Sequence, residues 1–131
     1  MEISKEKFIS KLEKSIDDLN IPYSREQLNL LWEYYLFFKE ENKKYNLSTI
    51  TEPEEVIKKH FLDSLVVLKD LNLKQKKRWL DIGSGAGFPG LVLKIFLPGH
   101  SFYLLDSSAK KVTFLNQLIY KLNLKGVDAT H

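Results

Sequence analysis

The sequence predicts an α/β protein in which N-terminal helices precede the first half of a doubly wound parallel sheet. In the N-terminal half, apolar residues recur three and four positions apart, which is typical of amphipathic helices. In the C-terminal half, short apolar runs at residues 79–82, 102–105 and 127–130 alternate with helical segments, which favours parallel strands. A glycine-rich turn at residues 83–87 follows the first run, as expected where a strand leads into a helix.

Composition limits the classes of protein that fit. A length of 131 residues and a hydrophobic content of 44% suffice for one folded domain, and no apolar run reaches the ~18 residues of a membrane span. The chain has no cysteine, which excludes disulfides and fits a cytoplasmic protein. Its three histidines, at positions 60, 100 and 131, lie too far apart to suggest a metal site. A net charge of +3 with several lysine pairs permits RNA binding, although lysine pairs are usually plain solvated surface.

Two N-terminal helices are predicted from their caps and apolar faces. The first is capped by Ser4, and its apolar face carries Phe8, Leu12, Ile16 and Leu19. A capping box at residues 24–27 begins a longer helix that reaches about Lys44. Because this longer helix is apolar on two faces, we expect it to pack between two layers.

Three further helices follow. Residues 51–54, Thr-Glu-Pro-Glu, have the form of a second capping box and predict a helix on which His60 and Asp63 are neighbours. These two side chains are expected to form a polar pair at the edge of the core. After the glycine turn, residues 91–97 should form a short helix, and Ser107 should cap the helix that leads to the last strand.

The glycine turn is the candidate ligand site. It follows Asp81, and its glycines at positions 83, 85 and 87 let the backbone approach a ligand where a Cβ would collide. A dinucleotide-binding turn would need a glycine at Phe88, so a nucleotide-dependent oxidoreductase is disfavoured. Asp106 ends the next apolar run, about 20 residues further on, where a carboxylate could bind both hydroxyls of a ribose. Alternatively, the glycines form an ordinary loop and Asp106 caps the following helix.

The pattern Asp-x-Gly-x-Gly-x-Gly over residues 81–87 resembles the first motif of class I (Rossmann-like) methyltransferases, in which the turn surrounds the methionine part of S-adenosylmethionine. Together with four other motifs in one order, it resembles the glucose-inhibited division protein B family. The other motifs are Tyr45-Asn46-Leu47, His60-Phe61-Leu62-Asp63-Ser64, Phe88-Pro89-Gly90 and Leu105-Asp106-Ser107. Members of that family are bacterial methyltransferases that use S-adenosylmethionine to methylate N7 of a guanine in small-subunit (16S) ribosomal RNA.

The resemblance implies which residues bind the cofactor, S-adenosyl-L-methionine. The implied cofactor-binding residues are Asp81, Gly83, Ser84, Gly85, Gly87, Phe88, Asp106 and Ser107. Gly83, Gly85 and Phe88 would line the methionine side, and Asp106 and Ser107 would lie at the ribose. Asp81 would steady the turn or reach the amino group through water. Three further motif residues, Asn46, His60 and Asp63, either brace the N-terminal helices against the turn or contact RNA, and no catalytic residue is assigned.

The resemblance also implies the organisation of the chain. Residues 1–72 would form a helical region packed on the core, and residues 73–131 the first part of the cofactor-binding domain. Because the family's sheet is larger, we expect an N-terminal portion or a naturally shortened form, with weak cofactor binding and negligible turnover. Leu80 and Ile82 would lie at an exposed apolar sheet edge and favour self-association. The expected partner is small-subunit ribosomal RNA or the assembling small subunit, and the alternative is a non-catalytic RNA-binding or ribosome-docking module.

Overall fold

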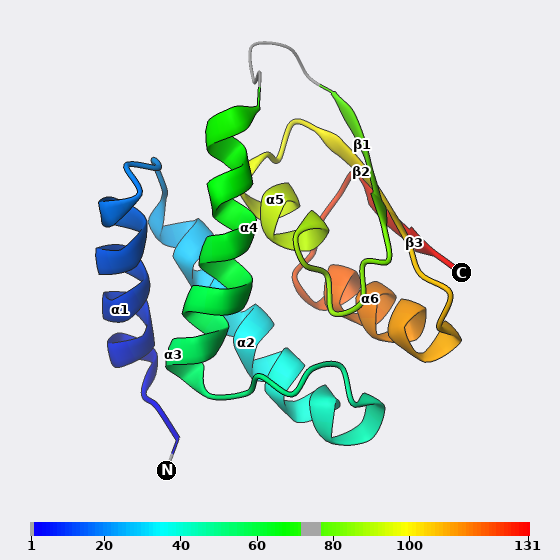
Figure 1. Cartoon of the computed structure of the whole chain (residues 1–131), viewed down its shortest axis with the longest axis horizontal. Helices are drawn as coiled ribbons and strands as arrows, with labels where there is room; N and C mark the ends of the chain where they lie inside the picture. The colour runs from blue at the N-terminus through cyan, green and yellow to red at the C-terminus, as the bar shows by residue number, and fades with distance from the viewer. Residues whose placement is uncertain (1, 72–76) are drawn as a thin grey trace.

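A computed structural model of the chain describes residues 2–71 and 77–131. Helices from the N-terminal part pack beside a three-stranded parallel sheet, which confirms the predicted α/β class (Figure 1). The predicted boundary between residues 72 and 73 lies outside the described residues, so the division into two regions stays a prediction.

The first two helices follow the predicted caps. Helix α1 is Lys5–Asp18, and the Ser4 hydroxyl accepts a hydrogen bond from the N–H of Lys7. Helix α2 is Arg25–Tyr45, and Ser24 and Gln27 make both hydrogen bonds of a capping box. Asn46 ends α2 in the left-handed conformation, with φ of 53°, which asparagine tolerates better than most residues. Local capping therefore sets the start of both helices and the end of α2.

The third helical segment is less regular than predicted. It consists of α3 (Pro53–Val56), the π-helical turn η1 (Ile57–Leu62), α4 (Asp63–Val66) and the 3₁₀ turn η2 (Val67–Asp70). The capping box predicted at residues 51–54 is wrong, because the cap residue is Glu52 and its side chain makes no capping hydrogen bond. Proline lacks an N–H and suits the first helical position, so Pro53 starts the helix one residue later than the pattern implied.

The sheet places two loop ends side by side. Its strands are β1 (Arg78–Ile82), β2 (Ser101–Leu105) and β3 (Val127–Thr130), in the order β1-β2-β3. Helix α5 (Gly90–Phe96) connects the first two strands and α6 (Ala109–Lys121) the second two. Ile82 pairs with Leu105 at the carboxyl ends of β1 and β2. The glycine turn and the segment that begins at Asp106 therefore leave the same edge of the sheet.

The residue that caps α6 is Ser108, not the predicted Ser107. The Ser108 hydroxyl accepts a hydrogen bond from the N–H of Lys111, at 3.3 Å. The reason lies one step earlier in the chain, since Asp106 Oδ1 accepts the N–H of Ser108 at 2.8 Å and thereby fixes Ser108 in the extended conformation of a cap residue.

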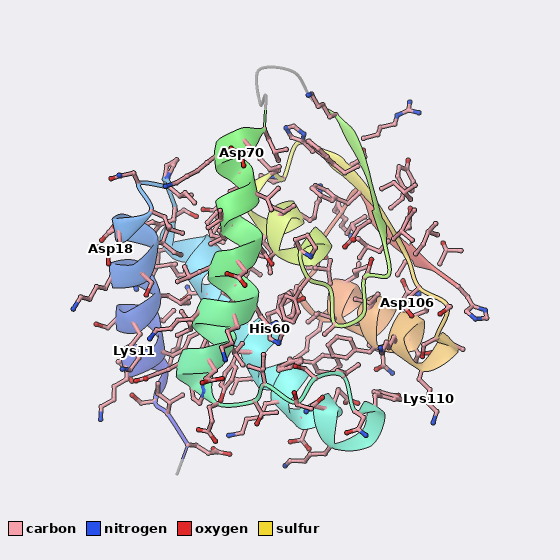
Figure 2. All side chains as sticks on the ribbon, in the orientation of Figure 1. Lys11, Asp18, His60, Asp70, Asp106 and Lys110 are labelled. Carbon is pink, nitrogen blue, oxygen red and sulfur yellow. The ribbon has the colours of Figure 1, made fainter. Side chains whose placement is uncertain are left out.

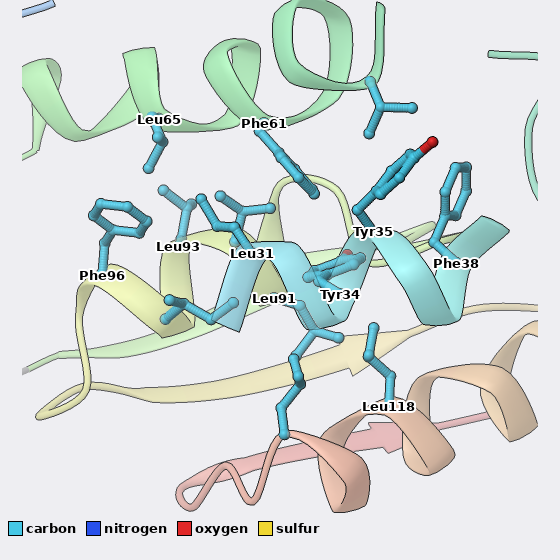
Figure 3. Close-up of a cluster of buried hydrophobic side chains, with 14 of the residues drawn as sticks. Leu31, Tyr34, Tyr35, Phe38, Phe61, Leu65, Leu91, Leu93, Phe96 and Leu118 are labelled. Carbon is cyan, nitrogen blue, oxygen red and sulfur yellow. The ribbon is translucent and has the colours of Figure 1, made fainter. Parts of the chain in front are cut away.

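Helix α2 lies in the middle of the molecule, as its two apolar faces predicted. It packs against α1 on one side and against α5 and α6 on the other. Figure 3 shows the side chains of this core, with Tyr34 of α2 between Phe61 of the third helical segment and Leu118 of α6. The largest fully buried side chains of α2 are Leu28, Leu31, Tyr34, Tyr35 and Phe38. Burial of each side chain of this size stabilises the folded state by about 1.5–3 kcal/mol. Because α2 packs on both sides, this burial joins the helical part of the chain to the sheet part.

One face of the sheet is open. Phe102 and Leu104 are buried beneath the helices, whereas Leu80, Ile82 and Tyr103 are 60%, 76% and 44% exposed. Within the described ranges, no helix covers this second face (Figure 1). The exposed apolar surface predicted at Leu80 and Ile82 is therefore present, and it lies on a face that includes the edge strand β1 and its neighbour.

Candidate functional site

The loop between β1 and α5 turns sharply at its glycines. Gly83, Gly85 and Gly87 have φ of 76°, 55° and 96°, in the left-handed region that favours glycine. A Cβ at Gly83 or Gly85 would have no atom within 4 Å, so the backbone there is open to a ligand. A Cβ at Gly87 would instead overlap the hydroxyl of Tyr34. The glycine turn, residues 83–87, thus has one open side and one packed side.

Asp81 holds the glycine turn from the strand. Its Oδ2 accepts the N–H of Gly90 at 3.0 Å, and the Ser84 hydroxyl donates to its backbone carbonyl at 3.0 Å. Burial raises the pKa of the Asp81 carboxyl, an effect opposed by the Gly90 N–H and reinforced by the charge of Asp106. These contacts are those of a residue that steadies the turn.

Asp106 holds the same turn from the neighbouring strand. Its Oδ2 accepts the N–H of Gly85 at 2.8 Å, while its Oδ1 accepts the N–H of Ser108. Partial burial alone would raise the pKa of the Asp106 carboxyl, but these two N–H groups and the charge of Lys111 hold it below its usual value. Figure 2 shows Asp106 and Lys110 beside the start of α6. The structure thus brings both predicted acids to the glycine turn.

Phe88, predicted to line the site, lies within a cluster of aromatic rings. The imidazole of His60 stacks on it with ring centroids 4.2 Å apart and an angle of 6° between the planes. Tyr34 stacks on it at 5.4 Å, and Phe38 and Phe61 contact it at 6.0 and 5.9 Å. Burial lowers the pKa of His60, although the charge of Asp63 opposes this. His60 therefore connects the helical segment to Phe88, the residue directly after the glycine turn, which favours the bracing interpretation.

His60 and Asp63 interact as predicted, through the charge of Asp63, which is exposed, but the hydrogen-bond partner of the imidazole is another residue. His60 Nε2 lies 3.0 Å from the Ser48 hydroxyl. Ser48 is in turn held by Asn42, whose side chain makes 2.9 Å hydrogen bonds with both the N–H and the carbonyl of Ser48. Asn42 and Ser48 were missed because they contact each other across the end of α2, where no helical spacing applies.

Two predicted residues lie at the rim of this arrangement. Asn46 is exposed and ends α2, and Ser107 is exposed, with its carbonyl 2.8 Å from Nε2 of His131. Among the described residues, no group of three His, Asp or Glu side chains is arranged to hold a metal. Over the same ranges, no helix has both the length and the apolar character needed to cross a membrane.

Comparison with known sequences identifies the family. Residues 27–131 match the GidB family, described as rRNA small subunit methyltransferase G. The chain belongs to the GidB family. The matched region begins in α2 and includes the aromatic cluster, the glycine turn and both acids. The sequence resemblance to this family is therefore confirmed.

Curated members of the GidB family are similar over most of this chain. The protein named ribosomal RNA small subunit methyltransferase G from Mesoplasma florum is 50% identical over 115 residues, which are 88% of this chain and 48% of that protein. Its namesake from Desulfitobacterium hafniense is 50% identical over 113 residues, 86% of this chain and 46% of the relative. The Clostridium botulinum protein of the same name is 39% identical over 124 residues, 95% of this chain and 52% of its own length. The chain thus spans about half the length of these relatives.

Proposed function

We propose that this chain supplies the S-adenosylmethionine site for methyl transfer to N7 of a guanine in small-subunit (16S) ribosomal RNA. The observation that carries the proposal is the convergence of the glycine turn, Asp81 and Asp106 at the carboxyl edge of parallel strands. Ligands of open α/β sheets bind at that edge. The names of the relatives support an rRNA substrate, and a cytoplasmic location is part of the same proposal.

The residues at the glycine turn fit the cofactor. The backbone at Gly83 and Gly85 is open on the side where a ligand would lie. Each oxygen of the Asp106 carboxylate accepts one backbone N–H and retains a second acceptor position, which suits the two hydroxyls of a ribose. The cofactor carries positive charge at its sulfonium and amino groups, which the two acids would stabilise. When bound, it supplies an electrophilic methyl group.

The chemistry of guanine N7 explains why no general base is assigned. N7 presents a free lone pair in the major groove and accepts a methyl group without losing a proton. The rate then depends on alignment of the nitrogen with the methyl carbon rather than on proton transfer. In this proposal the role of the chain is to hold the cofactor rigidly, and His60, stacked on Phe88, serves that purpose rather than taking a proton.

The RNA substrate is expected to present its guanine outside a regular helix. The major groove of A-form RNA is deep and narrow, so N7 is hard to reach there. Lys110 and Lys111 lie in the first turn of α6, near Asp106, where they could contact phosphates of such an RNA (Figure 2). The same lysines favour the second candidate function, a non-catalytic RNA-binding or ribosome-docking module.

Calorimetric titration with S-adenosylmethionine tests the proposal. We expect the wild-type chain to bind and Asp106→Ala to weaken binding roughly 10- to 100-fold, the effect of losing hydrogen bonds to a charged group. Asp128→Ala is the matched control, because Asp128 is an exposed acid on the neighbouring strand β3. Equal affinity of wild type and Asp106→Ala would contradict the proposed site. A folded wild type that binds RNA but not the cofactor would favour the docking module.

A further inference from the structure

We propose that Tyr34 of helix α2 is a positioning residue for the cofactor, because it fixes the glycine turn from α2 while Asp106 fixes it from the end of β2. Its hydroxyl donates a buried hydrogen bond of 2.5 Å to the carbonyl of Ala86, which is 52 positions away in the sequence. The proposal deepens the proposed function, and it rests on that function only for its effect on cofactor affinity.

Tyr34 contacts three consecutive residues of the loop. Besides its bond to Ala86, its ring stacks on Phe88 with centroids 5.4 Å apart and an angle of 10°. Its hydroxyl also occupies the space that a Cβ at Gly87 would need. Phe61 packs edge-on against the Tyr34 ring, with ring centroids 5.4 Å apart. Figure 3 shows both side chains within the buried cluster. Tyr34 itself is 0% exposed.

The glycine turn is therefore held from two layers. Asp106, from the sheet, accepts the N–H of Gly85, and Tyr34, from α2, donates to the carbonyl of the next residue, Ala86. Ala86 is buried, and the Tyr34 hydroxyl supplies a hydrogen-bond donor to its carbonyl, as a buried backbone carbonyl requires. Burial raises the pKa of Tyr34 well above its usual value, which keeps the hydroxyl protonated as a donor. A turn fixed in this way is organised before a ligand binds, which lowers the cost of binding.

The neighbouring residue provides a matched control. Tyr35 is also buried, at 1% exposure, but its hydroxyl has no hydrogen-bond partner among the residues that the structure describes. Tyr34→Phe and Tyr35→Phe therefore each delete one hydroxyl from adjacent buried tyrosines and keep the ring in place. Only Tyr34→Phe removes a contact with the glycine turn.

Amide hydrogen exchange of the 131-residue chain tests the proposal, with peptides that cover residues 83–90 and residues of α1. We expect Tyr34→Phe to accelerate exchange in residues 83–90 roughly 5-fold or more, as for the loss of one buried hydrogen bond, and to leave α1 unchanged. Tyr35→Phe should leave residues 83–90 as in the wild type. The affinity for S-adenosylmethionine should fall by a similar factor in Tyr34→Phe and not in Tyr35→Phe.

The outcomes separate this proposal from the proposed function. Unchanged exchange in residues 83–90 of Tyr34→Phe would overturn the positioning role, and so would equal acceleration in the turn and in α1, which would indicate a general loss of stability. If Tyr34→Phe loosens the turn alone but the wild type does not bind S-adenosylmethionine, the positioning of the turn stands and the cofactor assignment fails. Equal cofactor affinity of all three proteins would leave the proposed function intact and refute the role of Tyr34 in binding.

Discussion

Replacement of Gly90 by alanine separates tertiary packing from helix propensity. Gly90 is the first residue of α5, where alanine ordinarily favours the helix by up to about 1 kcal/mol. Here an added Cβ would lie 2.5 Å from Leu104 Cδ2 and 2.6 Å from Asp81 Oδ2. Overpacking of this kind costs about 1–3 kcal/mol, and displacement of Asp81 would weaken its hydrogen bond with the Gly90 N–H. We therefore expect Gly90→Ala to destabilise the chain by about 2–4 kcal/mol.

Urea denaturation followed by circular dichroism measures this effect, with Asp81→Ala as a second background. Because Asp81→Ala removes the carboxylate that the new Cβ would meet, the two changes should be non-additive, and Gly90→Ala should cost at least ~1 kcal/mol less in that background. A Gly90→Ala variant as stable as the wild type, or more stable, would refute the packing of α5 against β1 and β2. Strict additivity would show that Asp81 is not the group displaced.

Three further outcomes are expected. Burial lowers the pKa of His60 in the folded chain below its ordinary value of 6.5, so the unfolded chain takes up the proton at a higher pH than the folded chain does. The free energy of unfolding should therefore fall as the pH drops below 6.5. Denaturation curves recorded at several pH values should show a smaller fall for His60→Gln than for the wild type. In sedimentation velocity, Leu80→Lys with Ile82→Lys should weaken self-association at least roughly tenfold, since burial of each such side chain contributes about 1.5–3 kcal/mol; a wild type that stays monomeric at high concentration would contradict this. Replacing Lys110 and Lys111 by alanine should reduce the slope of log affinity for RNA against log salt concentration. An unchanged slope would show that these lysines do not contact RNA phosphates.

Local chemistry made much of the fold predictable. The capping box at Ser24 and the apolar spacing of α1 and α2 depend on residues a few positions apart, so the sequence alone indicates them. The two errors at caps, Thr51 and Ser107, arose where a neighbour competes. Pro53 selects the start of α3, and Asp106 fixes Ser108 rather than Ser107 at the start of α6.

The candidate site was predictable only in part. The positive φ of the glycines and the convergence of Asp81 and Asp106 follow from strand ends and spacing along the chain. The groups that hold the turn from the helical side could not be found in this way. Tyr34 reaches Ala86 across 52 positions, and Ser48 reaches His60 across 12, so these contacts depend on how separate segments pack rather than on any local pattern.

An amide chemical-shift map of the ¹⁵N-labelled chain titrated with S-adenosylmethionine directly tests the claim that the glycine turn and Asp106 form a cofactor site. We expect the shifts to concentrate in residues 83–90 and 106–108, with little change in α1. Shifts centred elsewhere, for example on the groove lined by Phe37 and Tyr120 between α2 and α6, would contradict the claim. So would a folded chain whose spectrum does not change at saturating cofactor.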